Sequence, residues 1–568
     1  MKYFVADFET TSFKQYQIDG ETRVFMWSIT DVETLKVVQR GLTIEEFFTW
    51  ATKTRRDKTT TIYFHNLKFD GSFIVNYLLK KGYKPVKKFS EDCNNEFETL
   101  ISEMGIWYGI TLKIKKANYV IRINIRDSFK KIPLSVETIA ETYNLPMSKG
   151  DFDYDMYRPL GYIPTDEEWS YVDRDTIIVA MAIREKLDKG MCKMTLGSDA
   201  YYNFKRRFSR KQFDYLFPIL PLEDWQYIKK AYKGGWTYAD KRYTGKVLHN
   251  VLSFDVNSLY PASMYNKPLP YGKPLYFTGK YTYDEQYPLY IQTIEVSFKL
   301  KENHLPQLQT SSLGHFTNDL FLTDTENNIV ELTLTNLDLE LFLEVHEVYY
   351  IKYLYGMKFK SHNHIFTEYI DEWAKIKEEA VGGERQIAKD MLCSLYGKFG
   401  TNPRNRDKIP TLNDDERLSF IFGEEYYSKW LKYIPIAVFT TAHARQVEIR
   451  TAQLFYDHFV YGDTDSIKLH NITLEDVKSK IHVDSKKLGA WKLDDQYETF
   501  KSLKAKHYAY TIQGDDELYI VASGLPKKAR EDIKHIDDFK VGYQTNKKLI
   551  QRQVKGGAVL IPTIHIIK

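Results

Sequence analysis

The chain has 568 residues, of which 43% are hydrophobic and 27% are charged. This length predicts three or four domains, and the composition excludes disordered, collagen-like and membrane-spanning proteins. With 80 Lys and Arg against 76 Asp and Glu the net charge is only +4, so binding of a polyanion must depend on local basic clusters.

The cysteines and the N-terminus indicate a protein of the cytoplasm. Cys93, Cys192 and Cys393 are too far apart for a paired zinc motif, and they do not suggest a disulfide framework. The first residues, MKYFVADFETT, lack the features of a secretory signal, and no apolar run of 18 residues follows.

The first elements expected along the chain are two strands, at 2–9 and 24–31, separated by a turn at Asp19-Gly20. A long helix is expected after the capping box formed by Thr165 and Glu168, and it should stop near residues 189–190. We therefore expect a domain boundary between residues 190 and 200.

The second half of the chain mixes short alternating runs with helix. Region 261–357 contains runs such as YPLYIQTIEVSFKL and is expected to form strands, whereas 364–399 is strongly helical. Segment 401–424 is polar and rich in turn residues, which predicts an inserted loop or hairpin.

Acidic residues gather at three places in the first 175 residues. Asp7 and Glu9 in DFETT are two apart on a predicted strand, so their carboxylates share a face. Asp70 lies four residues after Asn66, and Asp175 lies four after Tyr171 on the predicted helix. A solvated strand edge would explain Asp7 and Glu9 alone, but four carboxylates with a tyrosine are what two-metal phosphodiester hydrolysis requires.

The order D-x-E, N-x3-D, Y-x3-D resembles the three motifs of proofreading 3′–5′ exonucleases with an RNase-H-like fold. The resemblance implies that Asp7, Glu9, Asp70 and Asp175 are metal ligands, that Tyr171 orients the attacking water and that Lys149 is the auxiliary lysine. It also implies that the frayed single strand is held by Thr10, His65, Asn66, Phe69, Ser128 and Phe129, the last standing where leucine is usual.

Two further acidic strings follow in the second half. DVNSLYP presents Asp255 after an apolar approach, and YGDTDS presents Asp463 and Asp465 two residues apart. YGDTDS alone is compatible with a polar β-turn. Together with the string from Lys389 to Gly397, however, they resemble motifs A, B and C of family B DNA polymerases, in the same order.

This second resemblance implies roles for the residues of motifs A and C. Asp255, Val256 and Asp465 would hold two magnesium ions, and Asp463 would support them. Val256 is also expected to contact the nucleotide. Tyr260 would lie under the deoxyribose and exclude ribonucleotides. Ser258 is expected among the DNA contacts.

A basic helix face is expected to meet the triphosphate. Arg385, Lys389, Cys393 and Tyr396 are spaced by four, four and three residues, and Lys377 extends the ridge. A basic helix face that only meets solvent would explain the charges, but it would not explain Tyr396 and Gly397 at the end of the helix. The family has asparagine at the position of Cys393, so nucleotide affinity or base discrimination is expected to differ.

Three motifs concern DNA rather than chemistry. They are the YxGG string with Tyr232, Gly234 and Gly235, the pair Thr441 and Arg445, which matches a template-strand motif, and the pair Lys506 and Tyr508 at the primer terminus. Between residues 205 and 246, eleven Lys and Arg stand against four Asp and Glu, with aromatic rings among them. Lysines for phosphates and rings for bases are the components of strand binding.

The resemblance covers the whole chain and is strongest to the protein-primed family B enzymes of the phi-29 type, found in small phages with linear genomes. It implies a multidomain α/β fold, with an RNase-H-like exonuclease domain followed by a right-hand polymerase with two insertions. The expected division is exonuclease 1–195, palm 196–260 and 425–524, first insertion 261–357, fingers 358–400, second insertion 401–424 and thumb 525–568.

The expected function is DNA-dependent DNA synthesis with 3′–5′ proofreading, protein-primed initiation and strand displacement in the cytoplasm of an infected host cell. Two Mg²⁺ ions per active site, replaceable by Mn²⁺, are the expected cofactors. The expected partners of a monomeric enzyme are primer-template DNA, the displaced single strand, dNTPs and a terminal protein, with no membrane.

Three alternatives stay open. The C-terminal half could only grip DNA for a stand-alone nuclease, or the chain could be a non-catalytic replication scaffold, although seven intact carboxylates argue against the scaffold. Within the polymerases, a DNA-primed or primer-independent enzyme is the nearest alternative. Nucleotide incorporation, with and without a terminal protein, separates these cases.

Overall fold

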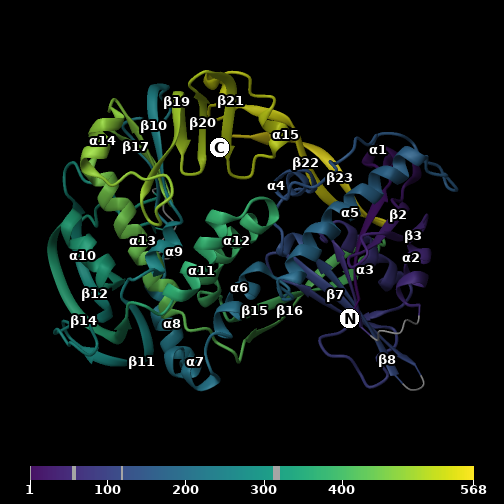
Figure 1. The fold of residues 1–568 in the computed structure, drawn as a ribbon, viewed down its shortest axis with the longest axis horizontal. Helices are drawn as coiled ribbons and strands as arrows, with labels where there is room; N and C mark the ends of the chain where they lie inside the picture. The colour runs from purple at the N-terminus through teal and green to yellow at the C-terminus, as the bar shows by residue number, and fades with distance from the viewer. Residues whose placement is uncertain (1, 54–58, 117–118, 311–319, 568) are drawn as a thin grey trace.

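The computed structural model describes residues 2–53, 59–116, 119–310 and 320–567. Figure 1 shows an N-terminal half, in purple and blue, beside a larger half in teal and green, with the yellow C-terminal segment reaching across to the first half. Among the helices of these described ranges, none has the length and apolar character needed to cross a membrane.

The N-terminal half is built on a mixed sheet with strand order β3-β2-β1-β4-β8-β7-β6-β5. Strand β1 pairs antiparallel with β2 and parallel with β4. The bounds are β1 Lys2–Thr10, β2 Val24–Asp31, β3 Val37–Gly41, β4 Thr59–Phe64, β5 Lys84–Pro85, β6 Glu96–Ile101, β7 Trp107–Lys116 and β8 Tyr119–Asp127; the helices are α1 Phe13–Asp19, α2 Ile44–Ala51, α3 Asp70–Lys80, α4 Val136–Thr142 and α5 Asp166–Asp188.

The alternation of β1 decides which side of this sheet carries chemistry. Phe4 and Phe8 belong to a core with α2 and α3, whereas Val5 belongs to a second core with α4 and α5. Because side chains alternate along a strand, Asp7 and Glu9 share the side of Val5 and therefore face α5.

The second half contains a sheet with strand order β21-β20-β19-β10-β18-β17-β9. Helix α13 packs on one face, where Phe254 and Val256 of β10 meet Ile449 of α13. Asp255 lies between these two apolar residues and therefore points to the opposite face. The bounds are β9 Thr237–Ala239, β10 Leu248–Val256, α9 Leu259–Met264, α13 Pro435–Leu454, β17 Phe459–Asp463, β18 Ser466–His470, α14 Leu474–Lys480, β19 Trp491–Lys504, β20 His507–Ile512 and β21 Asp515–Ala522.

Helices and a separate sheet flank this central sheet. The separate sheet has the order β11-β14-β12-β13, and its longest strand runs past residue 357 to His362. Residues 311–319, within the expected first insertion, lie outside the described residues. The bounds are α6 Leu196–Lys205, α7 Arg210–Leu216, α8 Leu222–Lys230, β11 Leu269–Thr278, β12 Leu289–Leu300, β13 Val330–Thr335, α10 Asn336–Val345, β14 His346–His362, α11 Thr367–Glu379 and α12 Gly382–Phe399.

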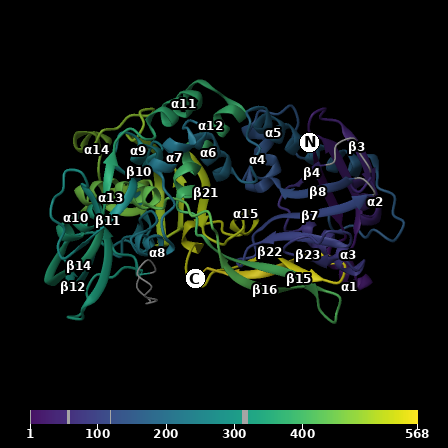
Figure 2. The ribbon, with the colours of Figure 1, turned by 90° about the horizontal axis from the view of Figure 1, so that it is seen from below.

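Two hairpins extend from the second half to the first. They consist of β15 Arg404–Leu412 with β16 Leu418–Tyr427, and β22 Gln544–Val554 with β23 Gly557–Ile566, the latter preceded by α15 Lys527–Arg530. Figure 2 shows them side by side next to the first sheet. Lys555 joins the tips, since its Nζ lies 2.7 Å from a carboxylate oxygen of Glu416 while its carbonyl accepts a 3.0 Å hydrogen bond from the amide of Thr22.

Most of the expected elements are confirmed. The strands at 2–9 and 24–31 are β1 and β2, the helix behind the capping box is α5, and 401–424 forms most of the β15–β16 hairpin. The turn at Asp19-Gly20 is confirmed, since Gly20 has a φ of 71°, but helix α1, which ends at this turn, was not expected.

Candidate active sites

The first site is a cavity of about 880 Å³ on the α5 side of the first sheet. Its lining includes Asp7 and Glu9 from β1, Asp70 from the start of α3 and Asp175 from α5. The four predicted carboxylates therefore meet, although they come from three elements spread over 169 residues of sequence.

The electrostatics of this cavity favour a bound cation. Burial, followed by the charge of Asp175, raises the pKa of Asp7 to about 7, and burial with the charge of Asp7 raises the pKa of Glu9 and of Asp70. One buried oxygen, Oδ1, of both Asp70 and Asp175 has no hydrogen-bond partner among the described residues. Such carboxylates are stabilised when a divalent ion replaces protons between them.

Within the described residues, we find no group of three or more Asp, Glu, His or Cys side chains that is already placed to hold a metal ion. The donor chemistry nevertheless fits magnesium, because the oxygens are hard and two of them lack partners. The ligand assignment of Asp7, Glu9, Asp70 and Asp175 thus stays a proposal.

Lys149 and two tyrosines, Tyr154 and Tyr171, also line this cavity. Lys149 Nζ lies 2.9 Å from an oxygen of Asp175, and the hydroxyl of Tyr171 lies 2.7 Å from that of Tyr154. Sequence reasoning missed Tyr154, although it follows Lys149 by only five residues. The nearby string GDFDYD contained no spacing that marked this tyrosine.

The residues expected to hold the single strand divide into two groups. Thr10, His65, Asn66, Phe69 and Phe129 line the cavity. Ser128 is buried instead, with its hydroxyl 2.9 Å from Nδ1 of His65. Ser128 therefore positions His65 and does not face the cavity directly. Leu549 and Pro562 of the β22–β23 hairpin form a further part of the wall.

The second site lies where β10 and β17 end and β18 begins. Ser466 of β18 is the register partner of both Asp255 and Asp463, and the amide of Val256 donates a 2.7 Å hydrogen bond to the carbonyl of Asp465. Asp255, Asp463 and Asp465 line a cavity of about 430 Å³. The sheet register thus brings together acids that lie 208 and 210 residues apart.

Electrostatic conditions here resemble those of the first site. Burial and then the charge of Asp465 raise the pKa of Asp255 to about 7, and burial with the charge of Asp463 raises the pKa of Asp465. Lys506 forms an ion pair with Asp463, and Tyr508 lines the same cavity. The expected primer-terminus residues therefore lie beside the expected catalytic acids.

Sequence reasoning missed other members of this cavity. Lys468 is 4% exposed and donates hydrogen bonds of 2.7 Å to Ser253 and 3.2 Å to Ser466. Asp494 and Asp495 also line the cavity. Lys468 stands two residues after Ser466 on β18, so strand alternation could have placed it on the reactive face.

Helix α12 confirms the shared face of Arg385, Lys389, Cys393 and Tyr396, and the ring of Tyr396 stacks on Tyr260 with centroids 4.1 Å apart. Lys377 differs from expectation because it lies on α11. The two helices are separated at residues 380–381, and Gly382, with φ of 59°, is the first residue of α12.

Lys377 still belongs to this region. Its Nζ lies 3.0 Å from the hydroxyl of Ser258, and its carbonyl accepts a 3.1 Å hydrogen bond from Arg385. The fold therefore joins the basic face to motif A.

The predicted template-strand residues lie inside the protein. Arg445 is 3% exposed and donates to both carboxylate oxygens of Asp338 and to the carbonyls of Lys233 and Gly234. Thr441 is 1% exposed and its hydroxyl donates within α13. The polar groups of both side chains already form hydrogen bonds inside the protein. The prediction that these two side chains contact DNA directly is therefore wrong.

The YxGG loop lies close to the second site. A Cβ at Gly235 would lie 2.9 Å from the hydroxyl of Tyr260 and 2.8 Å from a side-chain carbon of Thr464, so a larger residue there would disturb the cavity. Tyr232 similarly approaches Gly400, at the end of α12. Arg445 holds this loop through two carbonyls, so its influence reaches the site indirectly.

Comparisons with known proteins agree with this arrangement. The family model for DNA polymerase type B, organellar and viral, matches residues 51–168 and 161–482. The chain belongs to this family. The DNA polymerases of Bacillus phages M2 and phi29 are 39% and 38% identical to this polymerase, with all of this chain and at least 99% of each relative covered.

More distant and structural relatives extend the comparison. The DNA polymerase of Streptococcus phage Cp-1 is 31% identical over 100% of this chain and 98% of its own. The structure of Phi29 DNA polymerase with primer-template DNA superposes with a TM-score of 0.92 at 37% identity, covering both chains completely. The predicted fold class, the enzyme class and the resemblance to the phi-29 type are thereby confirmed.

Proposed function

We propose that this enzyme copies DNA at the second site and removes mismatched 3′ ends at the first. The observation that carries the proposal is the separation of two acidic cavities on two different sheets, each with a lysine paired to one of its acids. Structures of Phi29 DNA polymerase with primer-template DNA, with single-stranded DNA and with incoming nucleotides support DNA and dNTPs as ligands.

In the polymerisation site, Asp255 and Asp465 would hold two magnesium ions together with the carbonyl of Val256, and Asp463 would support them. When bound, the ions lower the pKa of the primer 3′-hydroxyl and neutralise charge on the phosphates. Arg385, Lys389 and Lys377 would bind the triphosphate, while Tyr260 supports the deoxyribose and Tyr396 supports Tyr260 through the observed stacking. Cys393 faces the nucleotide with a thiol, a weaker hydrogen-bonding group than the amide usual in the family.

In the exonuclease site, Asp7, Glu9, Asp70 and Asp175 would hold the metal ions, with Mg²⁺ replaceable by Mn²⁺. Tyr171 orients the attacking water, and Lys149 places positive charge beside Asp175. Thr10, His65, Asn66, Phe69 and Phe129 contact the frayed strand, and Ser128 positions His65.

At the primer-template, Lys506 and Tyr508 contact the primer end, and the loop with Tyr232, Gly234 and Gly235 steadies the duplex. Arg445 acts through that loop by its hydrogen bonds to the carbonyls of Lys233 and Gly234, and Thr441 supports α13 from inside the protein. Ser258 completes the set through its contact with Lys377.

We retain the proposed division into exonuclease 1–195, palm 196–260 and 425–524, insertions 261–357 and 401–424, fingers 358–400 and thumb 525–568. The contact between Lys555 and Glu416 supports a second insertion that closes with the thumb around DNA, as processive strand displacement requires. The first insertion would contact a terminal protein whose hydroxyl primes synthesis. The enzyme acts as a monomer in the cytoplasm of the infected host cell.

The test uses two variants of the full chain. Asp255→Asn should abolish extension of a primed template with dNTPs and Mg²⁺ while degradation of a single-stranded oligonucleotide continues. Asp7→Ala with Glu9→Ala should have the reverse effect. Loss of both activities in either variant would contradict two separate sites.

A second assay tests the priming mode. Labelled dNTPs, Mg²⁺ and the candidate terminal protein are incubated with linear genome ends but without an oligonucleotide primer. A protein–nucleotide adduct that depends on the polymerase is expected. Extension of DNA primers with no adduct would favour the DNA-primed alternative.

A further inference from the structure

The exonuclease site depends on a long irregular segment. Residues 143–165, all of them described by the structure, contain no helix or strand, yet they carry Lys149 and Tyr154 to the wall of the first cavity. Ordering such a segment costs conformational entropy that no helix or strand hydrogen bonds offset. Specific contacts must therefore hold it in one conformation.

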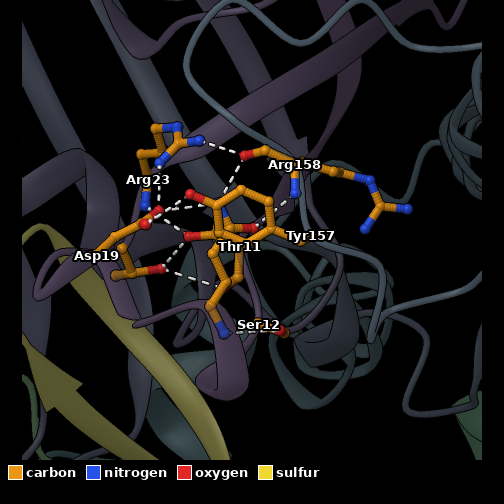
Figure 3. Close-up of polar contacts among 8 residues, drawn as sticks. Thr11, Ser12, Asp19, Arg23, Tyr157 and Arg158 are labelled. Carbon is orange, nitrogen blue, oxygen red and sulfur yellow. Dashed lines mark hydrogen bonds and ion pairs between the residues drawn. The ribbon is translucent and has the colours of Figure 1, made fainter. Parts of the chain in front are cut away.

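The first set of contacts joins this segment to helix α1 through the backbone of Arg158. The side-chain amide of Gln15 donates a 2.6 Å hydrogen bond to the carbonyl of Arg158 and accepts a 3.0 Å hydrogen bond from its amide. Both residues are 2% exposed. Asp19 supports the pair, because its carboxylate accepts hydrogen bonds from Gln15, Arg23 and Tyr157, as Figure 3 shows for its labelled members.

The second set uses the guanidinium of Arg158. It donates hydrogen bonds of 3.0 and 2.7 Å to one carboxylate oxygen of Glu168, the residue that forms the capping box at the start of α5. It also donates to the carbonyls of Asp153 and Met156 within the segment. One buried side chain therefore ties the segment to itself and to the helix that carries Tyr171 and Asp175.

Aromatic contacts lead from the guanidinium to the reactive groups. The guanidinium lies 4.7 Å from the ring centroid of Phe152, and that ring lies 4.8 Å from Tyr171 and 4.9 Å from Tyr154. The two tyrosine hydroxyls are 2.7 Å apart. A shift of Arg158 would therefore displace Tyr154, and with it Lys149 in the same segment.

We propose that Arg158 is a positioning residue of the exonuclease site, which holds the segment from Lys149 to Tyr157 between α1 and α5 so that Lys149 meets Asp175 and Tyr154 meets Tyr171. This inference rests on the proposed exonuclease function. Gln15 is its partner, because it fixes the same segment through the backbone.

The proposal is tested with Arg158→Lys and Gln15→Glu in the full chain. Lysine cannot reproduce the forked contact with Glu168, and glutamate places an oxygen opposite the carbonyl of Arg158. Both variants should lower kcat for degradation of a single-stranded oligonucleotide by about 10- to 100-fold, since small misplacements of catalytic groups have effects of this size. KM and the extension rate on a primed template should stay unchanged.

Arg126→Lys is the matched control. This half-buried arginine lies in the same domain and donates to Ile110, Thr111 and Asn124, away from the cavity. Its exonuclease rate should equal that of the wild type. An equal loss in Arg126→Lys, or a parallel loss of polymerisation in Arg158→Lys, would overturn the assignment in favour of general destabilisation.

A double-mutant cycle separates positioning from a merely structural role. In a background carrying Lys149→Met and Tyr154→Phe, Arg158→Lys should reduce the remaining rate by less than about twofold, because the groups it positions are absent. A further loss as large as in the wild type would refute the proposal. If the wild-type protein does not degrade the oligonucleotide, the proposed function fails instead; if it does and Arg158→Lys matches it, only the positioning role fails.

Discussion

Replacing Arg445 with alanine should destabilise the polymerase half far more than replacing Arg450, although both arginines connect α13 to α10. Arg445 and Asp338 have side chains that are 3% and 1% exposed, and the guanidinium also donates 2.6 and 2.8 Å hydrogen bonds to the carbonyls of Lys233 and Gly234. Arg450 pairs with two glutamates on the surface, and its side chain is 40% exposed.

The magnitudes follow from burial. Removal of one partner from a buried ion pair costs about 3–5 kcal/mol of unfolding free energy, because the other charge is left without compensation. Lys233 reduces this penalty for Asp338 only in part, since burial lowers the pKa of Lys233 to about 8. An exposed pair contributes about 0–1 kcal/mol, so Arg450→Ala should be nearly neutral.

Urea denaturation at 25 °C, followed by tryptophan fluorescence, measures both variants against the wild type. Burial alone would raise the pKa of Asp338, but the charges of Arg445 and Lys233 hold it below its ordinary value. The stabilisation from Asp338 is therefore present above pH of about 4 and is lost as the pH falls through the lowered pKa. The difference between wild type and Arg445→Ala should shrink in acid.

Equal losses in Arg445→Ala and Arg450→Ala at neutral pH would refute this reasoning. Arg445→Ala should also weaken primer-template binding, because the YxGG loop loses two hydrogen bonds, while degradation of single-stranded DNA continues. Gel-shift titration with a primed hairpin measures the first effect.

Three other predictions concern residues in or near the two sites. Both carboxylate oxygens of Glu448 are buried without partners among the described residues, and burial, then the charge of Asp465, raises its pKa. Glu448→Gln should therefore raise the unfolding free energy by about 1–3 kcal/mol at pH 8 in EDTA. This gain should vanish below about pH 4.3, where Glu448 is protonated in the folded and the unfolded protein. An unchanged urea midpoint at pH 8 would contradict the prediction. Tyr260→Val should increase ribonucleotide incorporation by about tenfold or more in single-nucleotide extension assays, whereas unchanged selectivity would remove Tyr260 from the sugar contact. Burial and neighbouring charges raise the pKa of Asp7 and of Asp255 to about 7, so Mg²⁺ binding should release protons and should weaken from pH 8 to pH 6. Calorimetry in two buffers with different ionisation heats detects the proton release. A binding heat that does not depend on the buffer would contradict the prediction.

The pairing of acidic residues in the first cavity was partly predictable because their spacing follows local rules. Asp7 and Glu9 share one face of a strand, and Tyr171 and Asp175 share one face of a helix, so each pair is defined within five residues. The sheets then bring the pairs together where strands end. Local periodicity placed each of these pairs on one face, whereas the fold class and the grouping of both sets of carboxylates came from the resemblance of the motifs, in their order, to a known family.

Orientation could not be predicted in the same way. Thr441 and Arg445, four residues apart, must share a face of α13, but spacing alone does not say whether that face meets DNA or the interior. Asp338 decides the question, and it lies 107 residues earlier on another helix. Arg158 presents the same difficulty, since its partner Gln15 is 143 residues away in a helix that the sequence did not reveal. A motif identifies the residues that matter, whereas partners distant in sequence determine whether each one touches the substrate or positions a residue that does.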